Sequence, residues 1–128
     1  MNPTAKPGLA PWVWRLMAWL WAIQVFIASV IPVGPNLGAN NLDKVFHLCQ
    51  YLLFAAILVP ALTPPEAPRR MRLRAFAWAT LYGIFIELVQ LLVPWRSGDW
   101  KDGLSNALGA AIGVSLWRRM QRKPSLTP

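Results

Sequence analysis

The stretch ELVQLLVPWRSGDWKDGLSNALGAAIG, residues 87–113, decides the fold of this chain. It begins in an apolar run that carries the carboxylic acid Glu87, breaks at Pro94, turns through a short charged loop and enters a second apolar run at Asp102. Ionisable groups inside apolar spans are costly and usually functional. The stretch therefore predicts two membrane helices joined by a loop, with polar groups gathered at one end of the pair.

The composition is typical of a membrane protein. The chain has 128 residues, enough for one domain, of which 55% are hydrophobic and 14% charged. Its single cysteine, Cys49, excludes an intrachain disulfide. The formal net charge of +8 would suggest nucleic acid in a soluble protein. Here the placement of the charges along the chain indicates membrane orientation instead. The expected partner is therefore the lipid bilayer, and no nucleic-acid partner is expected.

Four apolar runs predict an all-α integral membrane bundle of four transmembrane helices, the last one short. The runs are Pro11–Ile31, Asp43–Leu62, Ala75–Val93 and about Asp102–Trp117. A cleaved signal peptide is the alternative for the first run, but the run is long and no small-residue cleavage motif precedes Pro32. Residues 1–10 and the basic residues 118–128 are expected to be tails on either side of a membrane domain at 11–117.

The basic residues predict the orientation of these helices. If both termini are cytoplasmic, the outer side holds Lys44, Arg96 and Lys101, and all other lysines and arginines lie inside. Cytoplasmic loops carry the excess of Lys and Arg in membrane proteins. The sequence therefore predicts a multi-pass protein of the bacterial cytoplasmic membrane with both termini in the cytoplasm.

With this topology, polar residues of three helices meet near the outer interface. Residues three or four apart share one face of a helix. The three polar stripes are Asp43, His47 and Tyr51; Glu87 and Gln90; and Asp102, Asn106, Gly109 and Gly113. Gly109 and Gly113 form a G-x-x-x-G pattern, which lets another helix pack closely and is a candidate contact for a homo-oligomer.

These residues resemble the pattern of the VanZ-like family of small bacterial membrane proteins. The resemblance rests on three ordered motifs that span roughly Leu42 to Gly113. They are Asp43-Lys44-x-x-His47-x-x-x-Tyr51, Glu87-x-x-Gln90, and Arg96-x-x-Asp99-x-x-Asp102-x-x-x-Asn106-x-x-Gly109. The resemblance implies a multi-helix integral membrane protein of a family whose founding members are associated with low-level teicoplanin resistance. It implies no particular biochemical activity.

The first functional hypothesis is an outward-facing pocket that binds, or acts on, a lipid-linked cell-envelope intermediate. The candidate acid–base residues are His47, Glu87 and Asp102. The candidate ligand-binding residues are Asp43, Lys44, Tyr51, Gln90, Arg96, Asp99 and Asn106. Arg96, Lys44 and Lys101 are expected to hold a phosphate or carboxylate, such as that of a lipid-linked or glycopeptide ligand.

Two other hypotheses use the same residues. In one, the polar groups bind a headgroup or a partner protein, or lock the helices together, without chemistry. In the other, Glu87 carries a proton in a small transporter, although the inner halves of the spans hold no matching polar relay. One histidine with the acids Asp43, Glu87 and Asp102 makes a weak metal-ligand pattern, so no metal and no cofactor are assigned.

Overall fold

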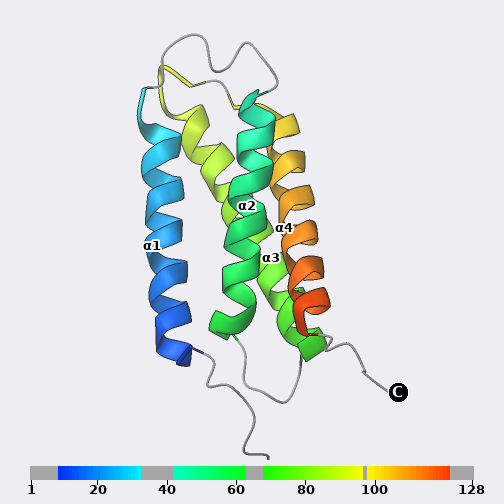
Figure 1. Ribbon diagram of the computed structural model, residues 1–128. Coiled ribbons are helices and arrows are strands. Elements are labelled where there is room, and N and C mark those ends of the chain that lie inside the picture. The colour runs from blue at the N-terminus through cyan, green and yellow to red at the C-terminus, as the bar shows by residue number, and fades with distance from the viewer. Residues whose placement is uncertain (1–8, 33–41, 63–67, 97, 122–128) are drawn as a thin grey trace, which may run out of the picture.

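The computed structural model describes residues 9–32, 42–62, 68–96 and 98–121, which form four α-helices arranged as an antiparallel bundle (Figure 1). The helices are α1 (Pro11–Val30), α2 (Leu42–Leu62), α3 (Pro68–Leu91) and α4 (Trp100–Gln121). Successive helices run in opposite directions, so the ends of α1 and α3 lie beside the beginnings of α2 and α4. The all-helical prediction is thereby confirmed.

Two helices are longer than the sequence predicted. α3 begins at Pro68, not at Ala75, and so includes Arg69, Arg70, Arg72 and Arg74, which precede the predicted apolar run. Proline is favoured in the first turn of a helix, where no partner exists for its missing N–H, and arginine is a good helix former. α4 runs on through Arg118 and Arg119 for the same reason and is therefore 22 residues long. Hydropathy alone marked only the apolar parts of these helices.

The axis of the bundle is α2, which packs most extensively against α4. Gly109 and Gly113 lie on this contact and are buried. A Cβ at Gly109 would meet the main-chain carbonyl of Leu48, and one at Gly113 would meet that of Leu52. The G-x-x-x-G pattern therefore serves close packing within one chain. A homo-oligomer through these glycines would have to displace α2.

The outer surface of the bundle is apolar on every helix. Large exposed side chains include Trp12, Trp19, Leu53, Leu73, Trp78, Ile84, Leu104 and Leu108. Soluble monomers rarely expose so continuous an apolar surface. By length and composition, α1 and α2 are the two helices of the described chain that are long and apolar enough to cross a membrane.

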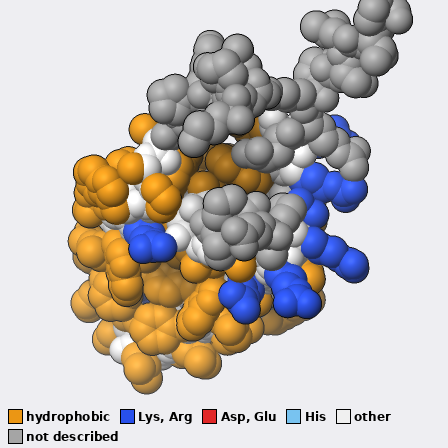
Figure 2. Space-filling view, turned by 90° about the horizontal axis from the view of Figure 1, so that it is seen from below, with side chains coloured by type: hydrophobic (Ala, Val, Ile, Leu, Met, Phe, Trp, Pro, Cys, Tyr) orange, Lys and Arg blue, Asp and Glu red, His pale blue; other side chains and the backbone are white. Residues whose placement is uncertain are grey.

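The two ends of the bundle differ in chemistry. Arginines gather at the end where α3 begins and α4 ends, and Figure 2 shows Lys and Arg side chains at that end beside the apolar surface. The buried polar side chains lie mostly towards the opposite end. They are Ser29, His47, Gln50, Gln90, Asp102 and Asn106. This segregation places the candidate site at the end where α2 and α4 begin.

Candidate functional site

A chain of buried polar contacts joins α2, α4 and α3. His47 Nδ1 lies 3.0 Å from Asn106 Oδ1, and the amide nitrogen of Asn106 donates to Glu87 Oε1 at 3.5 Å. Asn106 is 1% exposed, so its amide has no access to water. The second carboxylate oxygen of Glu87 is buried and finds no donor among the described residues. Glu87 therefore reaches His47 only through Asn106.

Gly83 makes room for this contact, and the sequence analysis did not single it out. A Cβ at Gly83 would lie 3.1 Å from Asn106 and from the ring of Tyr51. Tyr51 is fully buried, and its hydroxyl has no hydrogen-bond partner in the described part of the chain. The ring of Tyr51 therefore contributes to packing, and no hydrogen bond of its hydroxyl holds it in place.

The predicted anion-binding cations do not form one cluster. Lys44 Nζ lies 3.5 Å from Asp99 Oδ2 and 3.7 Å from Asp102 Oδ1, so carboxylates already neutralise it. Lys101 is exposed, and its backbone N–H donates to Asp99 Oδ1 at 3.0 Å. That N–H, together with the ammonium of Lys44, holds the pKa of Asp99 below its usual range.

Arg96 lies apart from Lys44, against the end of α1. Its Nη2 donates to the carbonyl oxygen of Ala28 at 2.9 Å. Its Nε is buried and finds no acceptor among the described residues. The side-chain amide of Gln90 also donates a hydrogen bond to the end of α1, to the carbonyl oxygen of Ser29 at 3.4 Å. Arg96 therefore keeps a buried N–H donor and a positive charge beside α1 and α2.

A groove of about 490 Å³ lies at this point, between α1, α2 and the end of α3. Its apolar lining includes Val25, Ile31, Leu42, Val45, Phe46 and Ile86. Its polar lining consists of Ser29, Asp43, His47, Gln50, Tyr51, Gln90 and Arg96. The groove thus offers a mainly apolar wall with charged and polar groups among it, which suits an amphiphile.

The structure brings most of the predicted residues together at one end, in two groups. Asp43, Lys44, Asp99 and Asp102 form the charged group, while His47, Asn106 and Glu87 form the buried chain beside it. Sequence reasoning gave α1 no part in the site, yet α1 forms one wall of the groove. The signal was Gln24, a polar residue in an apolar run, which accepts from the amide of Gln50 at 3.2 Å.

Comparison with known proteins identifies one related family. The family model of VanZ/LLP1 matches residues 7–121, which is nearly the whole chain. Neither a search of curated proteins nor a search of solved structures found a match. The match covers all four helices and the residues of the site, and the chain therefore belongs to the VanZ/LLP1 family.

Proposed function

We propose that all four helices cross the bacterial cytoplasmic membrane, with both termini in the cytoplasm and the polar end facing outwards. The apolar surface of α3 and α4 supports this, because Leu73, Ile84 and Leu108 are exposed there as fully as comparable residues of α1 and α2. The arginines at the opposite end of the bundle follow the rule that cytoplasmic segments are basic.

Cysteine labelling tests this topology. The native Cys49 is first replaced by serine, and single cysteines are placed at the exposed positions Trp100 and Arg119. A membrane-impermeant maleimide should label Trp100→Cys in intact cells and Arg119→Cys only after lysis. The reverse pattern would invert the topology, and labelling of both in intact cells would remove α4 as a span.

We further propose that the groove binds a lipid-linked, anionic intermediate of the cell envelope. The observation that carries this is Arg96, whose buried Nε lacks an acceptor where it lines an otherwise mainly apolar groove. An oxyanion of a phosphate would satisfy that donor and the charge together. The lipid chain would lie along Val45, Phe46 and Ile31 and leave the groove between α1 and α2.

His47 is the candidate acid or base within this proposal. It lines the groove, whereas Glu87 contacts it only through Asn106 and so acts as a positioning residue. Hydrolysis or group transfer at the lipid-linked phosphate is the reaction class to test first. The resistance phenotype associated with the founding members of the family gives the cellular readout, which is sensitivity to teicoplanin.

A binding assay with defined lipids tests the groove. Purified protein in detergent is titrated with a long-chain polyprenyl phosphate and with the uncharged polyprenol. A charge-assisted hydrogen bond contributes about 1.5–3 kcal/mol, so Arg96→Gln should weaken binding of the phosphate at least about tenfold. Arg74→Gln, an exposed arginine at the basic end, is the matched control and should bind like the wild type.

A second variant keeps the test decisive if Arg96→Gln folds poorly. Val45→Trp fills the groove from an exposed position and leaves Arg96 in place. It should also weaken binding of the polyprenyl phosphate. Equal binding by the wild type and both groove variants would refute the proposal that the groove binds this lipid.

The alternative hypotheses have their own outcomes. If the variants lower only the melting temperature, the non-enzymatic scaffold hypothesis is favoured. A proton flux in liposomes that disappears in Glu87→Gln would favour the transporter.

A further inference from the structure

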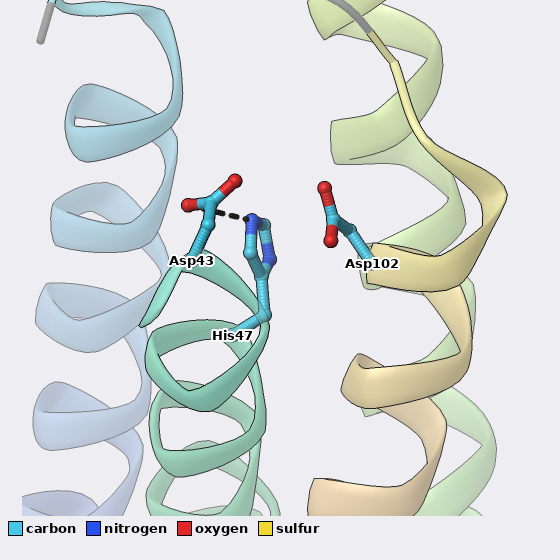
Figure 3. Close-up of side chains that lie close together, drawn as sticks. All are labelled: Asp43, His47 and Asp102. Atoms are coloured by element: carbon cyan, nitrogen blue, oxygen red, sulfur yellow. Dashed lines mark ion pairs between the residues drawn. The ribbon is translucent and has the colours of Figure 1, made fainter. Parts of the chain in front are cut away.

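Three potential metal ligands converge where α2 faces α4. Asp43 and His47 lie one turn apart on α2, and Asp102 points towards them from the first turn of α4 (Figure 3). One ligand atom from each of the three lies within 4.8 Å of the other two. Asp43 Oδ1 and His47 Nε2 are 3.8 Å apart. The spacing i, i+4 on a helix is the one by which paired side chains share a metal ion.

The hydrogen bond of His47 to Asn106 leaves its other ring nitrogen directed at Asp43. The amide of Asn106 donates to Glu87, which assigns the Asn106 oxygen to the side of His47. His47 Nδ1 is therefore the protonated nitrogen in the neutral ring, and the lone pair of Nε2 faces Asp43. A metal-binding histidine characteristically donates its other ring N–H to an acceptor in this way.

Asp102 supplies an independent indication of a ligand. Its side chain is 7% exposed, and its Oδ1 is buried without any hydrogen-bond donor among the described residues. The nearest cation is Lys44, 3.7 Å from Oδ1 and also 3.5 Å from Asp99. The carboxylates of Asp99 and Asp102 therefore share one ammonium group, and the carboxylate of Asp43 lies beside His47, 3.8 Å from its Nε2. A buried carboxylate oxygen with no donor is costly unless a cation completes its environment.

We propose that Asp43, His47 and Asp102 bind a divalent transition-metal cation. One imidazole and two carboxylates suit Zn²⁺ or Mn²⁺ better than Mg²⁺, which prefers oxygen ligands and several waters. Zinc–ligand distances are about 2.0–2.2 Å. Side-chain rotations that move each ligand atom by roughly 1 Å would bring the three atoms to these distances from one ion. Three protein ligands leave at least one open coordination position, and Asp43 and His47 also line the groove.

Metal titration of the purified full chain, without a polyhistidine tag and after treatment with a chelator, tests this proposal. Zn²⁺ is titrated against a chromophoric chelator, and Co²⁺ is added separately to read its visible absorption, which reports ligand type. The wild type should bind one Zn²⁺ per chain and melt at a higher temperature when loaded. Asp102→Asn and His47→Gln should each weaken binding at least about tenfold and change the Co²⁺ spectrum.

Two controls separate a metal site from general electrostatics. Asp99→Asn removes a nearby carboxylate that is not a ligand and should change the affinity only a few-fold, and Cys49→Ser should leave it unchanged. Asp43→Asn serves as the ligand variant if Asp102→Asn is unstable. Equal Zn²⁺ affinity in the wild type and the ligand variants, or loss of binding in Cys49→Ser, would overturn the proposal. The titration contains no added polyprenyl phosphate, so its outcome does not depend on whether the groove binds a lipid.

Discussion

Replacement of Gly109 by alanine should force α2 and α4 apart. The new Cβ would meet the carbonyl oxygen of Leu48, with the carbonyl carbon at 3.0 Å and the Cα atom at 3.1 Å. These main-chain atoms cannot rotate away, so the helices themselves must separate. A gap of about 0.5–1 Å forfeits roughly a quarter to a half of the dispersion attraction along the contact. Overpacking of this kind costs about 1–3 kcal/mol, and a clash with rigid backbone belongs at the upper end.

Gly103→Ala is the matched control on the same helix. Its Cβ would lie 3.9 Å from Glu87 Cγ, an ordinary contact, so it gains helix propensity without a clash. Both substitutions gain up to about 1 kcal/mol of propensity, so the difference between them, about 3 kcal/mol, isolates the clash. Thermal unfolding in detergent, followed by the fluorescence of the eight tryptophans, measures it. If Gly109→Ala had the same melting temperature as Gly103→Ala, equal to or above that of the wild type, the close contact of α2 and α4 would be refuted.

Three further predictions use the same unfolding assay. Tyr82→Phe should lose about 1 kcal/mol, because its hydroxyl donates to the carbonyl oxygen of Ala22 at 2.7 Å, whereas Tyr51→Phe should be neutral or stabilising; equal losses would contradict this. Asn106→Leu should lose about 1–3 kcal/mol by leaving two buried polar partners unpaired, and a neutral result would show that water replaces them. Because folding lowers the pKa of Asp99, its stabilising contribution is complete well above the ordinary value of 3.8 and is lost as the pH falls through the folded-state pKa. The difference in melting temperature between the wild type and Asp99→Asn should therefore shrink on acidification below pH 3.8, and a constant difference would exclude this role.

Local spacing predicted correctly which residues share a helix face. Asp43 and His47 are in contact, and Tyr51, one turn further, is buried on the same side of α2. The pattern of Gly109 and Gly113 likewise predicted close packing of the fourth helix. These predictions succeed because the helical repeat alone determines which side chains are neighbours along one helix.

The partners across helices could not be predicted in this way. Lys44 and Arg96 were expected to hold one anion together, but Lys44 pairs with carboxylates and Arg96 binds the last turns of α1. Which cation meets which acid depends on how far each helix is turned and shifted against its neighbours. The sequence also gave no sign that Gly83 yields the space beside Asn106.

The sequence by itself determined four helices, their polarity from one end to the other, and which polar residues share a helix face. Those features follow from hydropathy, helix periodicity and charge placement, which are properties of each segment alone. Only the tertiary structure decided that Asp102 lies opposite Asp43 and His47, and that α1 completes a groove beside them. Both depend on the packing of α2 against its neighbours, where two glycines allow backbone-to-backbone contact with α4 that no single segment specifies.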